Sequence, residues 1–365
     1  MKFFVRILAL SAMGMAAFPS FGQTSTHAGH SHDHTLSQAL GSPMSIMGEH
    51  VHEKGEWMLS YRYMFMDMDG MRAGNDGVSA QQVFASPYAV TPERMTMDMS
   101  MVGVMYSPTD RFTLMAMFQY KSLEMDHLIN PAAGPLLALN GGSNRFTTRS
   151  EGFGDIVLSG LYKLHSTDCF QWLAGLGLSL PTGSMGEQDI VPGPGGLIPR
   201  QLPAAMQLGS GTVDFLPSMT VTQHYDAWML GAQARGVIRT NDGTHGYRFG
   251  NRLNLDLWGA WSPLRWFSVT AGVGYGYEGS LRGGQAGVAT NVLFPPGIPS
   301  VPTAQSANYG GQRIDAILGL NFVIPQGMLR GNRLGIDLRL PMYQNLNGVQ
   351  LETDYTLTAG WSWAF

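Results

Sequence analysis

The stretch Leu351 to Phe365, LETDYTLTAGWSWAF, decides the fold. Apolar side chains, most of them large, occupy every second position, and small or polar ones lie between them. The first set is Tyr355, Leu357, Ala359, Trp361, Trp363 and Phe365, and the second is Asp354, Thr356, Thr358, Gly360 and Ser362. Strict alternation indicates a strand between an apolar and a polar environment. Because the apolar side becomes aromatic where a membrane interface would lie, we expect the closing strand of a transmembrane β-barrel.

The composition fits a barrel better than a bundle of membrane helices. Charged residues make up 13% of the 365 residues, but no apolar run long enough for a membrane helix follows the start of the chain. The formal net charge of -4 argues against a nucleic-acid partner. The lone Cys169 excludes an internal disulfide framework, so we expect it to pack within a strand. A soluble secreted all-β protein is the alternative, but it would not expose such apolar strand faces.

The first residues read as a targeting segment. Lys2 and Arg6 are followed by an apolar run and then by the small-residue site Ser20-Phe21-Gly22, a pattern typical of a secretory signal peptide. We therefore expect a signal peptide at residues 1–22, a flexible His- and Met-rich periplasmic segment at 23–55, and a β-barrel at 56–365. The barrel would lie in the outer membrane of a Gram-negative bacterium, inserted by the barrel assembly machinery and surrounded by outer-membrane lipid.

Alternation continues along the whole barrel region. It predicts a 12-stranded, antiparallel, up-and-down barrel with strands at 56–68, 94–106, 111–121, 155–164, 170–180, 212–223, 227–239, 248–261, 266–278, 312–324, 333–342 and 351–365. Short and long connections alternate between these strands. Short turns are periplasmic and long loops extracellular in outer-membrane barrels, so both chain ends would be periplasmic. The last strand would pair with the first.

Methionine is concentrated in the first third of the chain. Of 24 methionines, 15 lie between Met44 and Met125, and strand propensity does not explain the bias. Met64 and Met66 share a polar side with Arg62, and Met115 and Met117 share one with Lys121, so both pairs would face the lumen. The row Met95, Met97 and Met99 is ambiguous. It faces inward only if Thr96, Asp98 and Ser100 lie beyond the outer edge of the membrane.

A thioether surface could bind Cu(I) or line a path for an apolar solute, and Met could also simply fill gaps or face lipid. The histidines add to the metal hypothesis, because short His-rich tracts bind Cu(II), Zn(II) or Ni(II). The alternative is a solvated tail. The candidate metal ligands are His27, His30, His32, His34, His50, His52, Met44, Met47, Met64, Met66, Met95, Met97, Met99, Met115 and Met117.

Charged residues on the polar sides of the strands form a second group. They are Arg62, Lys121, Arg235, Arg252, Asp256, Arg313, Asp315, Asp337, Arg339 and Asp354. We expect them to line the lumen, either as a network that stiffens it or as a polar lining that selects solutes.

Motifs for catalysis fail on context. Gly274-x-Gly276-x-x-Gly279 satisfies a dinucleotide-binding pattern, but it ends a strand and leads into a loop without a helix. His245 has no identifiable nucleophile with an orienting acid, and no G-x-S-x-G elbow occurs. We therefore do not expect an enzyme, and a barrel hydrolase is kept only as the third hypothesis.

The chain resembles a bacterial outer-membrane transporter family linked to the MetA pathway of phenol degradation. The resemblance rests on Gly48-Glu49-His50, Gly55 to Arg62, Met66-Asp67-Met68-Asp69-Gly70 and Gly152-Phe153-Gly154-Asp155-Ile156. It implies transport of a small solute without fixing which one. The leading hypothesis is a channel for a small solute, with copper or another soft metal ahead of an aromatic compound. The second is a barrel that sequesters metal without passing it. No resident cofactor is certain, and copper is the candidate.

Overall fold

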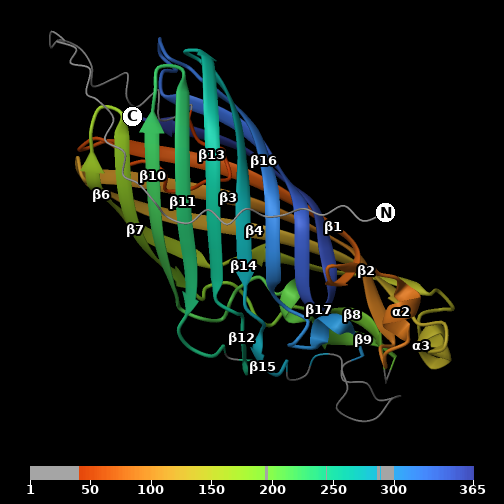
Figure 1. Cartoon of the computed structure of the whole chain (residues 1–365). Coiled ribbons are helices and arrows are strands. Elements are labelled where there is room, and N and C mark those ends of the chain that lie inside the picture. The colour runs from red at the N-terminus through yellow and green to blue at the C-terminus, as the bar shows by residue number, and fades with distance from the viewer. Residues whose placement is uncertain (1–40, 194–195, 244, 286–287, 289–299) are drawn as a thin grey trace, which may run out of the picture.

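The computed structural model describes residues 41–193, 196–243, 245–285, 288 and 300–365, and the expected signal peptide and His27 to His34 lie outside them. Eleven antiparallel strand elements form a closed barrel (Figure 1). No helix within these ranges is long and apolar enough to cross a membrane. The barrel elements are β1 (Trp57–Gly74), β3 (Val90–Thr109), β4 (Phe112–Ile129), β6 (Ile156–Ser166), β7 (Phe170–Leu180), β10 (Asp214–His224), β11 (Trp228–Arg239), β13 (Arg252–Leu264), β14 (Phe267–Glu278), β16 (Gly311–Val323) and β17 (Asn332–Ala364).

Neighbours in the barrel are neighbours in sequence, and β17 pairs with β1 to close it. At this seam Trp57 N donates to Phe365 O at 2.8 Å, and Phe365 N donates to Trp57 O at 2.9 Å. β17 spans 33 residues and doubles back on itself: residues 333–346 pair with β16, and residues 346–364 pair with β1. The predicted pairing of the last strand with the first is confirmed.

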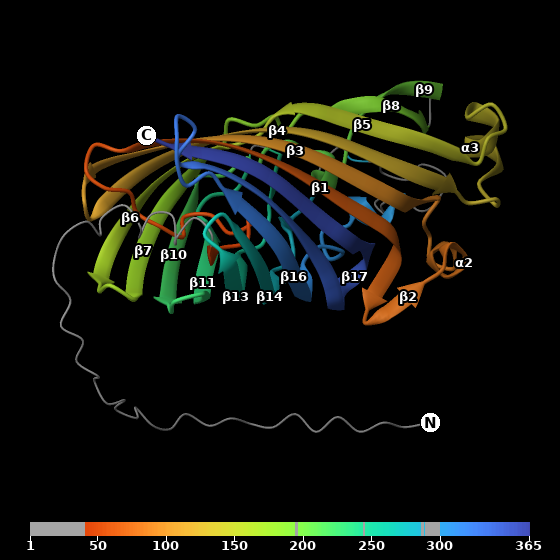
Figure 2. The ribbon, with the colours of Figure 1, turned by 90° about the horizontal axis from the view of Figure 1, so that it is seen from above.

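Three strands in the first third of the chain are longer than the sequence predicts, and the last two predicted strands extend to meet at residue 346 within β17. β1, β3 and β4 extend beyond residues 56–68, 94–106 and 111–121, toward the end of the barrel with the long loops (Figure 2). In this extension β4 leaves β6 and pairs instead with β5 (Arg145–Phe153), which lies outside the barrel path. On β4 the added outward positions carry Ser122, Glu124 and Asp126, whereas Leu123 and Met125 face inward and are buried. The apolar outward face that reveals a membrane strand therefore does not continue into the extension.

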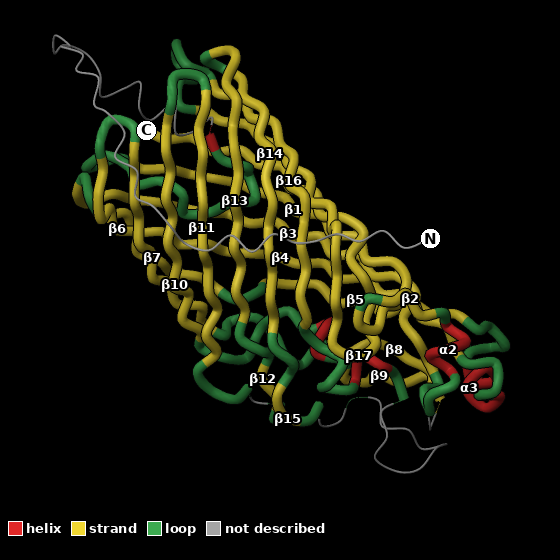
Figure 3. Tube along the Cα trace, in the orientation of Figure 1, coloured by secondary structure: helices red, strands yellow, loops and turns green. Residues whose placement is uncertain are grey.

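The remaining elements lie in the long connections, at the end opposite the short turns (Figure 3). These are β2 (Asp76–Val78), α2 (Ala80–Phe84), α3 (Gly134–Leu139), β8 (Gln188–Gly193), β9 (Gly196–Gln201), η1 (Ala204–Met206), β12 (Tyr247–Arg248), β15 (Arg282–Gly283) and η2 (Pro302–Ala304). Following the rule for outer-membrane barrels, we place the short turns at the periplasmic end and these elements at the extracellular end.

The outer face of the barrel is apolar. Leu257 and Leu318 have 63% and 52% of their surface exposed, and aromatic residues such as Trp228 and Trp261 lie near the short turns. The inward face carries the buried polar groups, among them Asp256, Thr270 and Asn321. A soluble protein places its apolar side chains inside and its polar ones outside. The reverse placement seen here is what a lipid environment requires.

A charge on this outer face should destabilise the barrel in a depth-dependent way. Leu257→Arg, halfway along β13, is expected to lower the free energy of unfolding by about 2–4 kcal/mol. The measurement is urea unfolding in lipid vesicles, followed by tryptophan fluorescence. Leu329→Arg is the matched control, because Leu329 is 61% exposed but lies in a short turn. Equal effects at both positions would contradict the assignment of Leu257 to lipid.

Candidate functional site

The lumen has two chemically different walls. The first, the methionine wall, is formed by the inward side chains of β1, β3 and β4. Cross-strand register aligns Met64 with Met99 and Met66 with Met97. The wall consists of Met58, Met64, Met66, Met68, Met95, Met97, Met99, Met101, Met105, Met115, Met117 and Met125.

The ambiguous row on β3 faces inward. Met95, Met97 and Met99 lie opposite Met68, Met66 and Met64, on the same face as the buried Arg62. Thr96, Asp98 and Ser100 therefore face outward. Asp98 accepts a hydrogen bond from Tyr63, and Arg94 pairs with Asp67 at 2.9 Å, so polar partners begin on the outer face at this level. The outer face thus becomes polar along the extended part of these strands. This is the condition under which the sequence allowed the Met95 row to face the lumen.

The second wall, the charged wall, lies on β11, β13, β16 and β17. Asp256 pairs with Arg339 at 2.9 Å and faces Arg235 at 3.7 Å. Arg313 pairs with Asp315 at 2.9 Å on β16. Asp256, Asp315 and Asp337 have 3% or less of their surface exposed. Because Asp256 and Asp315 each pair with an arginine, the wall is polar but carries little net charge.

Three of the predicted lining residues lie at the rim or near it. Arg252 pairs with Glu278 at 2.7 Å at the extracellular mouth. Lys121 borders the same mouth and donates to Leu208 O at 2.9 Å. Asp354 is the extra residue of a bulge between Thr353 and Tyr355. Its side chain is exposed and does not join the Arg313–Asp315 pair. The bulge shifts the alternation by one residue, which separates Asp354 from Thr356 and Thr358, whose side chains are buried.

Residues 41–56, here called the N-terminal segment, lie inside the barrel near the short turns. Side chains of the charged wall bind its backbone. Arg333 Nη2 donates to Ser42 O at 2.5 Å, and Asp337 Oδ1 accepts from Ser45 N at 2.9 Å. Arg339 Nε donates to Ser45 Oγ at 3.0 Å. These contacts tie the segment to one side of the lumen.

Strands on other sides of the barrel also bind the N-terminal segment. Arg62 Nε of β1 donates to Met44 O at 3.1 Å, and Gln233 Nε2 of β11 donates to Met47 O at 3.0 Å. Trp258 Nε1 of β13 donates to Gly41 O at 3.0 Å. Because its partners come from β1, β11, β13 and β17, the segment crosses the lumen.

Apolar contacts fill the spaces between these hydrogen bonds. Ile46 is fully buried and packs with Met229 and Trp258. Met44 lies against Gly335 and Gly360 of β17, where an added Cβ would approach Met44 Cε and Sδ to 2.7 and 2.6 Å. The two glycines therefore make room for this methionine side chain, and Met44 is placed in packing contact rather than at an exposed site.

The histidines of the N-terminal segment pair with carboxylates. His52 Nδ1 lies 3.1 Å from Glu56, and His50 Nδ1 lies 3.2 Å from Glu49, which also pairs with Arg333 at 3.4 Å. Burial alone would raise the pKa of Glu49, but His50, Arg333 and Arg62 hold it well below its usual range. Burial lowers the pKa of His52, and the hydrogen bond that His52 makes to the Glu56 carboxylate opposes this only in part. In the described part of the chain, no three His, Cys, Asp or Glu side chains gather as a metal site would require.

At the opposite end lie the described residues of 181–213, here called the outer loop, and residues 202–208 of this loop fold into the mouth. Leu202, Met206 and Leu208 of the loop pack on Met95 and Met125 of the methionine wall. The loop is fastened by Asp155, which accepts from Gly183 N at 3.0 Å and from Ser210 N at 2.8 Å. Both ends of the methionine wall are therefore covered by chain segments.

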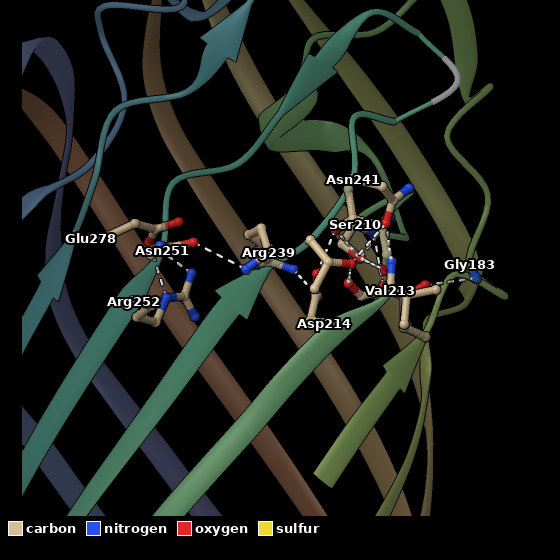
Figure 4. A network of polar contacts seen from close by, with 12 residues as sticks. Gly183, Ser210, Val213, Asp214, Arg239, Asn241, Asn251, Arg252 and Glu278 are labelled. Carbon is tan, nitrogen blue, oxygen red and sulfur yellow. Dashed lines mark hydrogen bonds and ion pairs between the residues drawn. The ribbon is translucent and has the colours of Figure 1, made fainter.

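Figure 4 shows the polar network that holds this loop at the rim of β10, β11 and β13. Arg239 pairs with Asp214, and Asp214 also accepts from Thr212 Oγ1 at 2.5 Å. Asn241 Oδ1 accepts from Val213 N at 2.9 Å, and Asn251 Oδ1 accepts from Arg239 N at 3.0 Å. The network joins the end of the outer loop to the ends of three strands.

Sequence reasoning did not assign roles to Ser45, Glu49 and Asp155. Glu49 and Asp155 occur in two of the four stretches that carry the family resemblance, so their positions were marked without a physical reason. Ser45 gives no periodic signal, because the N-terminal segment has no regular secondary structure and its contacts are all distant in sequence.

A closed β-barrel with an apolar outer face belongs to the class of outer-membrane barrels, which places this chain in the outer membrane of a Gram-negative bacterium. The fold is similar to that of the COG4313 outer membrane channel from Pseudomonas putida F1, with a TM-score of 0.56 and 16% identity over 89% of this chain and 99% of that one. No protein-family profile and no curated protein matches the sequence.

Two further solved structures match less closely. A FadL homologue from Pseudomonas aeruginosa has a TM-score of 0.40 and 11% identity, over 85% of this chain and 90% of that one. The toluene transporter TodX from Pseudomonas putida has a TM-score of 0.38 and 10% identity, over 90% of this chain and 97% of that one. At such identities the matches describe the fold alone.

Lowering the pH should loosen the N-terminal segment. The docked segment holds His52 with a pKa below 6.5, whereas a released His52 regains its ordinary value, so docking weakens as the pH falls below 6.5. We expect hydrogen exchange of residues 41–56, corrected for intrinsic rate, to rise between about pH 7.5 and about pH 5.5. Glu49 stays ionised in this range and Glu56 faces His52 throughout. His52→Gln should flatten the dependence, and an unchanged profile in that variant would refute the role of His52.

Removing the Asp155 carboxylate should free the outer loop. Asp155→Ala leaves Gly183 N and Ser210 N without their acceptor, at a cost of about 1.5–3 kcal/mol for each charged hydrogen bond. Trypsin cleavage after Arg200 in the outer loop should therefore become several-fold faster. Asp242→Ala is the control, because Asp242 is 78% exposed and lies 3.6 Å from Arg248. Equal cleavage rates in the two variants would contradict this anchoring role.

Proposed function

We propose that the protein is an outer-membrane channel that moves a small solute through the lumen between the methionine wall and the charged wall. The observation that carries the proposal is that noncovalent contacts hold both closing segments. Arg62, Arg333 and Gln233 hold the N-terminal segment by hydrogen bonds to its backbone. Such contacts can be exchanged for water when the segment leaves. The similarity in fold to a solved outer membrane channel supports the same reading.

We infer twelve membrane strands for this channel, because the two halves of β17 each pair antiparallel with a different neighbour. An even count brings both ends of the barrel to the periplasmic side. The link to the MetA pathway, the signal peptide and the barrel assembly machinery stay predictions from the sequence. A non-enzymatic role is part of this proposal.

A second candidate is a barrel that holds a solute or metal without passing it. The closure of the lumen by two segments favours this alternative, since a solute between them would be trapped. The two candidates differ in one property, which is whether ions cross the barrel when the N-terminal segment is released.

Conductance in planar bilayers separates them. The variant Arg62→Gln/Arg333→Gln removes contacts to Met44 O, Ser42 O and Glu49, and breaking a buried ion pair costs about 3–5 kcal/mol. We expect its mean conductance in potassium chloride to exceed that of the parent protein several-fold, because the segment no longer blocks the lumen.

The matched control is Arg145→Gln/Arg149→Gln. It removes two arginines whose side chains are 69% and 68% exposed and pair with Glu93 and Glu124 outside the lumen. Its conductance should equal that of the parent. In a second variant, Arg62→Gln/Arg333→Gln/Asp155→Ala, the outer loop also loses its anchor. If hydrogen exchange shows that residues 41–56 and the outer loop are both released in this variant and the barrel still does not conduct, the channel function is refuted and sequestration is favoured.

A further inference from the structure

We propose that the methionine wall is a binding path for a soft monovalent cation of the Cu(I) class. The inference rests on the proposed channel function and names its solute. Thioether sulfur is a neutral, polarisable ligand that prefers such cations. Four features of the wall carry the argument: its continuity, the one-sided placement of sulfur, the exposure of its central rows, and the neutrality of its ligands.

The wall is continuous from one closing segment to the other. Register divides the inward face of β1, β3 and β4 into six successive levels, and every level contains at least one methionine. In order from the periplasmic end, the levels carry Met58, Met105 and Met115; then Met117; then Met101; then Met64 and Met99; then Met66 and Met97; then Met68, Met95 and Met125. Levels on one strand face are about 6.6 Å apart, so an ion passes from one sulfur group to the next in short steps.

The sulfur is confined to the lumen side. In the same six levels, none of the outward positions of these strands carries methionine. The levels nearer the periplasm carry Leu59, Val102, Leu114 and Phe118, which are 37% to 47% exposed, and the levels nearer the extracellular end carry polar residues such as Thr96 and Asp98. Strand propensity and hydrophobicity favour β-branched and aromatic residues on either face. A requirement for bulk alone would not exclude them from one face, so the segregation indicates that the sulfur atom matters.

Two of the four central levels are accessible, those of Met64 with Met99 and of Met66 with Met97, whereas Met117 and Met101 in the other two are each 8% exposed. The periplasmic level packs with Val51, Leu161 and Leu173, and the extracellular level packs with Leu202 and Met206. Met64, Met66 and Met99 belong to neither of these clusters and are only partly buried, while Met97 borders the outer-loop cluster. Side chains that only fill gaps would be buried along the whole wall. The partly exposed rows therefore form the candidate site.

The geometry of paired strands suits low coordination numbers. Side chains directly opposite each other have Cβ atoms about 4.5–5.5 Å apart, and the flexible thioether can bring two sulfurs onto one ion. Met64 lies opposite Met99, and Met66 lies opposite Met97. On β17, Thr358 and Thr356 flank these rows and supply hydroxyl oxygens.

The ligands are neutral, and this favours passage over storage. Conduction requires several sites that each bind weakly enough to release the ion. The nearest cationic side chain in register with Met99 is Lys121, whose ammonium donates to Leu208 O. Its charge reduces the affinity for a cation at this level. Arg62, Gln119 and Lys121 also interrupt the hydrocarbon surface, which makes the wall a poor path for an apolar solute.

The test is titration of Ag⁺, a redox-stable soft cation, into the refolded mature chain in nitrate buffer by calorimetry. Cys169 is exposed in the turn before β7, so the expectation that it packs within a strand was wrong. Every protein carries Cys169→Ser, because this exposed thiol would bind the probe. In the test variant Met64, Met66, Met97 and Met99 are changed to leucine, a swap that conserves volume. We expect the Ag⁺ affinity of the lumen site to fall about tenfold or more.

The matched control changes Met219, Met328 and Met342 to leucine. These side chains are 46%, 97% and 72% exposed and lie away from the wall. Its Ag⁺ affinity should equal that of the parent. Equal affinity in the test variant and the parent would overturn the cation path. Potassium chloride conductance, measured on the test variant that also carries Arg62→Gln/Arg333→Gln/Asp155→Ala, keeps the two proposals apart. If this barrel conducts and the Ag⁺ affinity of the test variant is unchanged, only the cation path is refuted. If it does not conduct although both closing segments are released, the channel is refuted.

Discussion

The pairing of β17 with β1 is the contact on which the rest of the structure depends. Lipid offers no hydrogen-bond partner to the free edge of a sheet, so a membrane sheet must close. The ladder between Trp57 and Phe365 at one end and Met71 and Leu351 near the other closes it. Closure in this register also fixes which face lies inside. A slip by one residue would move every methionine of β1 to the lipid side and bring Trp57 and Tyr61 into the lumen.

Given this register, the inward face supplies the contacts that hold both closing segments. Most of the side chains that bind the N-terminal segment belong to barrel strands. They bind mainly the backbone of the segment, at Met44 O, Ser42 O and Met47 O. The specificity for the docked segment thus comes from the barrel, with Gly335 and Gly360 giving Met44 its place. The outer loop follows the same rule, because Asp155 and Lys121 of the barrel bind its backbone. The barrel is the rigid frame, and the closing segments are held by replaceable contacts.

The sequence predicted the strands because their period of two is a local signal. Residues 351–365 and 56–68 pair as expected, and so do the neighbouring strands that the short turns connect. Alternation tells which residues share a face, but it does not tell which face is inside, and for Met95 to Met101 both faces looked plausible. The answer depended on the extension of β1, β3 and β4, where the outer face becomes polar. Asp354 was assigned to the lumen because a bulge cannot be recognised from alternation alone.

The N-terminal segment and the outer loop were beyond prediction for a different reason. Their residues follow no period, and their contacts join positions up to 294 residues apart in sequence, as between Ser45 and Arg339. Chemical type was nevertheless informative. Methionine enrichment pointed to a wall before its strands were placed, and the inward charges were recognised as a group even though their pairing was not.

The two walls have complementary consequences for a solute. Asp256 and Asp315 are each paired with arginine, so the charged wall attracts water without presenting a large net field. A cation in the lumen would then be hydrated on one side and in contact with thioethers on the other. Hard ions keep their water and gain little from sulfur, whereas a soft ion exchanges part of its hydration for Met64, Met66 and their partners. Selectivity in such a passage would come from the ligand type on one wall, and the opposite wall would keep the cost of entry low.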